Sequence, residues 1–129
     1  MKRVSSADEV INSKIINPGS IIYAAGNAAA PQELLLQLAT DLAIKDVDIF
    51  SILLLGERLA PLFSRERCQD LTHRVIFNSY LSKEAVNNGW AKYHPMHLSE
   101  VPRYIRRVKP NGVLLTVSST EKDGNYSLG

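Results

Sequence analysis

Disulfide bonds, membrane-spanning runs and a strong charge of one sign are all missing from this sequence. It contains one cysteine, Cys68, in 129 residues, which excludes an internal disulfide framework and indicates a reducing compartment. The longest apolar run, around residues 49–55, is far too short to cross a bilayer. The formal net charge of +2 is too small to indicate nucleic acid or a membrane surface as a partner.

The N-terminus also lacks the apolar segment of a signal peptide, because charged and polar residues interrupt residues 8–14. Together with the single cysteine, this predicts a cytoplasmic protein. Apolar residues make up 45% of the chain and charged residues 22%, which is ordinary for a globular protein. The length suits one domain, so we expect residues 1–129 to belong to a single folded unit.

The stretch from residue 20 to residue 42 reads as a strand, a tight loop and a helix. Residues 20–25 are apolar and rich in β-formers, as in a buried parallel strand. Gly26 and Asn27 interrupt that pattern, and Pro31 suits the first position of a helix, where its missing N–H costs nothing. Four leucines then recur at helical spacing and predict one apolar face: Leu34, Leu35, Leu38 and Leu42.

Further strands are predicted at residues 47–55, 73–77, 90–93 and 113–117, and helices at 6–14, 82–89 and 99–108. Residues 56–69 are predicted to be irregular, with one helical turn. Strands separated by helices favour an α/β fold with an open, mostly parallel sheet and helices on both faces. The chain ends about a dozen residues after the last strand, without a covering helix, so we expect the truncated N-terminal domain of a larger protein.

Open α/β sheets bind ligands at the carboxyl ends of their strands, and the loop after residue 25 lies at such an end. We expect Gly26, Asn27 and Ala28 to line that edge and to offer backbone N–H groups to an anionic group. A side chain at position 26 is expected to enter the cleft. Ser118 follows the last strand and is expected at the same edge, where Gly124 allows a tight turn. A plain connection with no ligand is the alternative for each of these residues.

The other reactive side chains form no recognisable catalytic or metal-binding pattern. His94 and His97 lack the third ligand that a catalytic zinc needs, so no metal site is expected. Cys68 has no CxxC partner and no base of recognisable spacing. The glutamates read as solvated charges, and we expect no catalytic residue among them: Glu57, Glu66, Glu84 and Glu100.

Four segments follow one another in order over nearly the whole chain: GNAAAPQELL, SKEAVNNGWAKYHP, HLSEVPRYIR and VSSTEKDGNYSLG. Together they resemble the N-terminal part of the acetyl-CoA hydrolase/transferase family, the family I CoA-transferase group that includes 4-hydroxybutyrate CoA-transferase. The resemblance implies transfer of CoA between a short-chain acyl-CoA, such as acetyl-CoA or 4-hydroxybutyryl-CoA, and a carboxylate. It also implies a glutamyl-CoA thioester on a glutamate of a C-terminal domain, to which nothing in this chain corresponds.

The resemblance further implies that coenzyme A is a substrate and that no other cofactor takes part. The expected partners are acyl-CoA, a small carboxylate, the C-terminal domain of the same enzyme and further copies in a homo-oligomer. The chain alone is expected to be inactive. An acyl-CoA hydrolase on the same scaffold, a non-catalytic binding or interaction module, and a half that assembles with a separate chain remain alternatives.

A patch of three arginines lies on the helix predicted at residues 99–108: Arg103, Arg106 and Arg107. We expect them to form a solvated helix face, and contact with a phosphate of CoA is the alternative.

Overall fold

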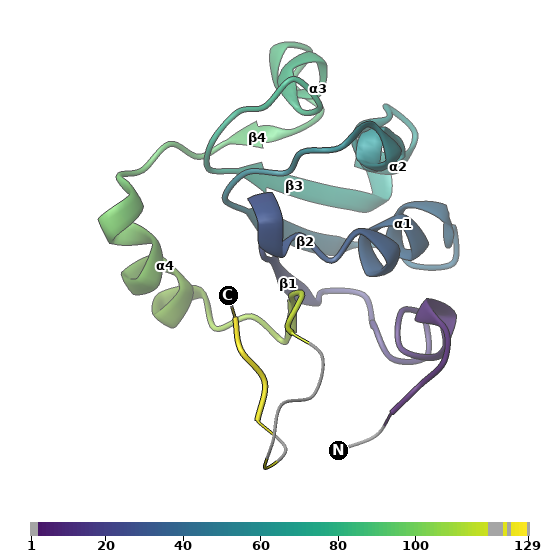
Figure 1. Ribbon diagram of the computed structural model, residues 1–129. Helices are drawn as coiled ribbons and strands as arrows, with labels where there is room; N and C mark the ends of the chain where they lie inside the picture. The colour runs from purple at the N-terminus through teal and green to yellow at the C-terminus, as the bar shows by residue number, and fades with distance from the viewer. Residues whose placement is uncertain (1–2, 119–122, 124, 129) are drawn as a thin grey trace.

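Five parallel strands form one sheet in the computed structural model, which describes residues 3–118, 123 and 125–128 (Figure 1). The sheet order is β4-β3-β2-β1-β5, and each neighbouring pair runs parallel. The strands are β1 (Ile21–Ala24), β2 (Val47–Ser51), β3 (Leu71–Val75), β4 (Lys92–Tyr93) and β5 (Gly112–Leu114). The expected open parallel α/β sheet is therefore confirmed.

Helical segments cover both faces of the sheet (Figure 1). The α-helices are α1 (Gln32–Thr40), α2 (Arg67–Asp70), α3 (Lys83–Asn87) and α4 (Val101–Val108). Short 3-10 turns complete the set: η1 (Ala7–Glu9), η2 (Asn27–Ala29), η3 (Glu57–Phe63) and η4 (Leu98–Glu100). Within the described residues, none of these helices has the length and apolar character needed to cross a membrane.

The strands divide their side chains between two apolar layers because successive residues point to opposite faces. On β2, Val47 and Ile49 join the large core beneath α1 and η3, whereas Phe50 joins the smaller core beneath α4. There the Phe50 ring meets Tyr104 edge-on, with ring centroids 5.5 Å apart. Helix α4 is thus packed against the sheet through the contact between Tyr104 and Phe50 and the apolar residues around it.

The helix predicted at residues 6–14 is wrong, since only the single turn η1 forms. The capping box of Ser6 and Glu9 is present, as the sequence pattern indicated. Asn12 then competes with a helix: its amide donates to the Asp8 carbonyl at 2.7 Å, and its side-chain oxygen accepts from the Lys14 N–H at 3.0 Å. Such local side-chain bonds offer the backbone an alternative to the helical ladder.

Helix α1 also ends before the predicted apolar face is complete. Leu35 and Leu38 are fully buried, but Leu42 lies beyond the helix and is 68% exposed. The Leu38 carbonyl of α1 accepts hydrogen bonds from the side chain of Arg67 rather than from a further helical turn. The end of α1 is therefore decided by a residue more than twenty positions downstream.

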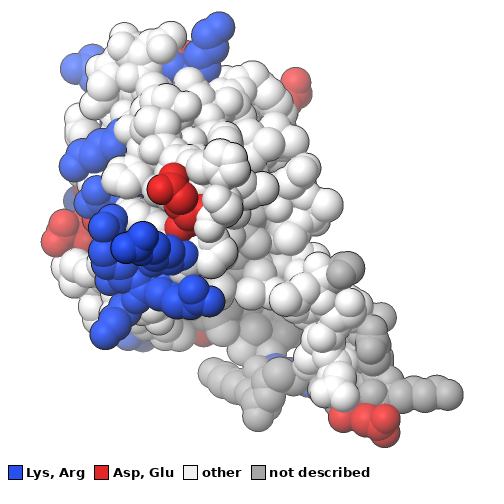
Figure 2. Space-filling view, turned by 90° about the vertical axis from the view of Figure 1, so that its left-hand side faces the viewer, with Lys and Arg blue, Asp and Glu red and all other residues white. Residues whose placement is uncertain are grey.

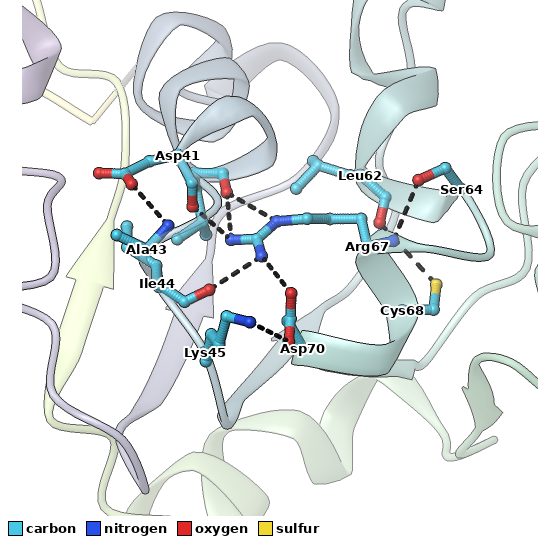
Figure 3. A network of polar contacts seen from close by, with 10 residues as sticks. Asp41, Ala43, Ile44, Lys45, Leu62, Ser64, Arg67, Cys68 and Asp70 are labelled. Carbon is cyan, nitrogen blue, oxygen red and sulfur yellow. Dashed lines mark hydrogen bonds and ion pairs between the residues drawn. The ribbon is translucent and has the colours of Figure 1, made fainter.

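Arg67 is 2% exposed and its guanidinium fills the space between α1, the following loop and α2 (Figure 3). It donates two hydrogen bonds to the Leu38 carbonyl at 2.8 and 3.2 Å, and one each to the carbonyls of Asp41 and Ile44 at 3.0 and 2.8 Å. The Asp70 carboxylate accepts a fifth bond at 3.3 Å. Burial lowers the pKa of Arg67, and the negative charges of Asp70 and Asp41 oppose that effect.

Replacing Arg67 by methionine should lower the free energy of unfolding by about 3–5 kcal/mol, because carbonyls at the end of α1 would lose their donors inside the protein. Urea unfolding followed by circular dichroism measures the change. The matched control is Arg65→Met, two residues away on the exposed surface, which should change stability by less than about 1 kcal/mol. Equal losses in the two variants would contradict a structural role for the Arg67 network.

His73 is a second ionisable side chain that the core encloses. It is 1% exposed, its ring lies 4.7 Å from that of Phe63, and its Nε2 atom has no hydrogen-bond partner among the described residues. Burial lowers the pKa of His73 to about 4, and the positive charge of Arg67 acts in the same direction. The folded protein therefore keeps this imidazole neutral at pH values where an unfolded chain would protonate it.

This difference makes stability depend on pH between about 6.5, the ordinary pKa of histidine, and about 4. Above pH 6.5 the imidazole is neutral in both states and stability does not depend on its protonation. Below pH 6.5 the unfolded state binds a proton that the folded state does not, so the free energy of unfolding falls, by about 3 kcal/mol in total. We expect His73→Leu to remove most of the decline between pH 6.5 and 5. Chemical denaturation at several pH values tests this, and a variant that declines as steeply as the native chain would disprove it.

Candidate functional site at the carboxyl edge of the sheet

A pocket of about 350 Å³ opens at the carboxyl ends of β1, β2 and β3. The loops that follow these strands form most of its wall, and Leu98 of η4 closes one side. The lining residues are mostly apolar or small: Tyr23, Ala25, Gly26, Asn27, Ala29, Ile52, Leu53, Phe77 and Leu98. The position is where parallel sheets bind ligands, because the strand ends and helix starts leave backbone groups unpaired there.

Gly26 lets the loop after β1 approach the loop after β2. A Cβ atom at this position would overlap the carbonyl oxygen of Leu53 and come within 2.8 Å of the Leu53 nitrogen. The expectation that a side chain at position 26 would enter the cleft is therefore wrong, since it would collide with the neighbouring backbone. Gly26 is required for the shape of the pocket wall, whatever the pocket binds.

Asn27 adopts the left-handed backbone region, with φ of 53°, which asparagine tolerates better than most residues. Its N–H donates to the Leu53 carbonyl at 2.8 Å, so this N–H is already used and cannot serve as an anion donor. In the part of the chain that the structure describes, no group accepts a hydrogen bond from the N–H of Gly26 or Ala28. These two amides, with the exposed Asn27 side chain, are the polar groups that the loop offers.

Ser118 is held by the tail of the chain rather than by this loop. It exchanges two hydrogen bonds with Ser127, one from its own N–H at 2.9 Å and one accepted by its hydroxyl at 2.9 Å. Gly124, the other site residue predicted near the C-terminus, lies outside the described residues. The structure therefore does not bring Ser118 into the pocket wall.

Thr116, rather than Ser118, contacts the loop after β1. Its N–H donates to the Ala29 carbonyl at 3.0 Å, and its hydroxyl donates to the Ala30 carbonyl at 3.2 Å. It lies two residues after Leu114 and so keeps to the same side of the extended chain. The two-residue spacing from Leu114 is the sequence signal that indicates this position.

None of the described side chains that line the pocket carries a carboxylate. Four glutamates read from the sequence as solvated charges are exposed: Glu57, Glu66, Glu84 and Glu100. Glu100 accepts a hydrogen bond from the His97 N–H at 2.9 Å in a capping box. The pocket can therefore hold and orient a ligand, and a nucleophilic carboxylate would have to come from elsewhere.

Cys68 is half-buried away from this pocket, and burial raises the pKa of its thiol to about 11. The thiol is therefore protonated at neutral pH, whereas the thiolate is the reactive form. Among the described residues, no three histidine, cysteine or acidic side chains lie close enough together to hold a metal ion.

Comparison with known proteins gives one partial sequence relative. The chain is 34% identical over 64 residues to succinyl-CoA:cyclohexane-1-carboxylate CoA transferase from Geobacter metallireducens, a match that covers 50% of this chain and 15% of the relative. No protein-family model matches the chain. The match supports a relationship to CoA-transferases in general, and the acetyl-CoA hydrolase/transferase group named above goes beyond it.

Solved structures share the fold over nearly the whole chain. RipA from Yersinia pestis superposes with a TM-score of 0.83 at 21% identity, over 97% of this chain and 31% of RipA. Two mutants of RipA give the same TM-score at 20% identity. The chain thus spans about a third of the length of these structures, and at this identity the likeness concerns the α/β fold alone.

Substituting alanine for Gly26 should lower the free energy of unfolding by about 2 kcal/mol or more, because the new methyl group would force the Leu53 backbone away. The control is Gly112→Ala, whose Cβ would meet only Ile22 Cγ1 at an ordinary 3.8 Å. That control should stay within about 1 kcal/mol of the native chain. Thermal and urea unfolding measure both variants, and a harmless Gly26→Ala substitution would contradict the close approach.

Proposed function

We propose that this chain is the N-terminal part of an acyl-CoA:carboxylate CoA-transferase that acts on a short-chain acyl group such as acetyl or 4-hydroxybutyryl. The observation that carries the proposal is the pocket at the carboxyl edge of the sheet, with apolar walls, the unpaired backbone N–H of Gly26 in its lining and that of Ala28 in the same loop. The partial identity to a CoA transferase supports the same reaction class.

The pocket suits the acyl end of a thioester. Its volume of about 350 Å³ lies at the small end of ligand sites, which favours a short acyl chain. Ile52, Phe77 and Leu98 provide apolar contact. The N–H groups of Gly26 and Ala28 are the candidate donors to the acyl or carboxylate oxygen, which gains negative charge when the thioester is attacked.

The reaction needs a carboxylate that attacks the acyl carbonyl and expels the CoA thiolate, which leaves an acyl–carboxyl anhydride. The thiolate then attacks the carbonyl of the enzyme carboxylate and releases the acid, which gives an enzyme–CoA thioester. No described side chain in the pocket can play this part. In the proposal a glutamate of the second domain supplies the nucleophile.

Transfer is favoured over hydrolysis by the apolar lining of the pocket. Water that reached the anhydride would release both acids and waste the thioester, so a transferase has to keep water from the reacting carbonyl. Side chains such as Tyr23, Ile52 and Leu98 would cover an acyl group on several sides. Product analysis of the two-domain enzyme with and without a carboxylate acceptor separates the two reactions.

Titration of the ¹⁵N-labelled chain with acetyl-CoA should shift the amide signals of Gly26 and Leu53, which line the pocket, and of Ala28 in the same loop. Removing apolar contact with Leu98→Ala should weaken binding by about three- to tenfold. Leu42→Ala is the matched control, because Leu42 is also an exposed leucine (68%, against 57% for Leu98) but does not line this pocket. Equal effects of the two substitutions, or no shift of the amide signals at the pocket wall, would refute the site.

The same chain should produce no labelled acyl-CoA when it is mixed with acetyl-CoA and a radiolabelled short carboxylate, because the described pocket holds no carboxylate nucleophile. The two-domain enzyme should produce it. Turnover by this chain alone would overturn the assignment of the nucleophile to a second domain.

A further inference from the structure

A second hollow, of about 700 Å³, lies over α4 on the opposite side of the sheet from α1. Its wall carries three arginines of the helix, Arg103, Arg106 and Arg107, together with His94 and Tyr104. Figure 2 looks at this side of the molecule and shows basic side chains gathered in one cluster, with acidic side chains beside it. The hollow therefore combines a concave shape with a local excess of positive charge.

The three arginines of this hollow lack a carboxylate partner, as do the exposed Arg3 and Arg65 elsewhere among the described residues. Arg58, Arg67 and Arg74 each form an ion pair. Within the described residues, no ion pair involves Arg103, Arg106 or Arg107. Glu100 is the one acidic residue in the described wall, and one of its carboxylate oxygens accepts a hydrogen bond from the His97 N–H.

One of the three guanidinium groups, that of Arg107, is also ordered by packing. Tyr104 is 9% exposed and anchors α4 to the sheet through Phe50. The Arg107 guanidinium lies over the Tyr104 ring at 5.6 Å, and the His94 ring packs against the same tyrosine at 4.9 Å. A cation held in this way loses less conformational freedom when it binds an anion.

The hollow over α4 (the α4 hollow) and the pocket of about 350 Å³ at the carboxyl ends of the strands (the edge pocket) are both lined by one segment of the chain. The segment 94–100 provides His94, Pro95, Met96 and Glu100 to the α4 hollow and Leu98 to the edge pocket. This arrangement suits one ligand with an apolar reactive end and a charged end, because the same segment borders both hollows. We expect the apolar end to bind in the edge pocket and the charged end to bind in the α4 hollow, because their walls differ in the same way.

We propose that the α4 hollow binds the phosphate groups of a small organic phosphate through Arg103, Arg106 and Arg107. Guanidinium groups match phosphate oxygens in geometry and charge, with up to two parallel hydrogen bonds for each arginine. The assignment of that ligand as coenzyme A rests on the proposed function. The phosphate site itself stands on the unpaired arginines and the hollow, so the two are tested separately.

Isothermal titration calorimetry and ¹H–¹⁵N spectra of the chain with inorganic pyrophosphate, coenzyme A and pantetheine test the proposal. Pyrophosphate and coenzyme A should shift the signals of α4 and of the arginine side chains, and pantetheine, which lacks phosphate, should not. The variant Arg103→Gln/Arg106→Gln/Arg107→Gln should lose affinity by about tenfold or more. Arg106→Gln alone should lose about threefold, and serves if the triple variant does not fold.

The control carries the same change of charge on exposed residues that do not line this hollow: Lys14→Gln/Arg65→Gln/Lys83→Gln. It should keep its affinity within about twofold, since only distant charges are removed. Equal weakening in the control, no binding of pyrophosphate to the native chain, or α4 shifts with pantetheine would overturn the phosphate site. Binding of pyrophosphate without coenzyme A would support the site and overturn its assignment to coenzyme A.

Discussion

The buried guanidinium of Arg67 is the interaction on which the large core depends. It donates to the carbonyls of Leu38, Asp41 and Ile44 and so ends α1, turns the chain toward β2 and attaches α2 to both. A cation is costly to remove from water unless its donors are satisfied, and here five hydrogen bonds satisfy them. Since α1 follows directly from the loop at Gly26, the position of the edge pocket depends on this network as well.

The edge pocket owes its shape to the close approach of two loops. Gly26 has no side chain to separate them, and the Asn27 N–H is bonded to the Leu53 carbonyl. Thr116 fixes the other end of η2 through the carbonyls of Ala29 and Ala30. With its backbone fixed in this way, the loop presents its free amides in a constant position, which is what stabilisation of a developing charge requires.

In the proposed function, the two hollows bind different ends of a thioester substrate. The edge pocket is apolar and small, whereas the α4 hollow is basic and larger. The segment 94–100 lies between them, so the packing of Tyr104 and His94 on α4 influences both. Similarity to a CoA transferase fits this division, and the missing carboxylate explains why a second domain is part of the proposal.

The sequence by itself determined the parallel α/β sheet and the place of the loop after β1, because apolar runs, turn residues and helical spacing are local signals. It also predicted the exposure of glutamates such as Glu57 and Glu84. Only the tertiary structure decided which polar groups are buried and hydrogen-bonded inside the protein. Arg67 lies in a run of charged residues that looks solvated, yet it is buried, and the Asn27 N–H is consumed by Leu53. These hydrogen bonds join residues that are distant in the sequence, so local composition and spacing could not predict them.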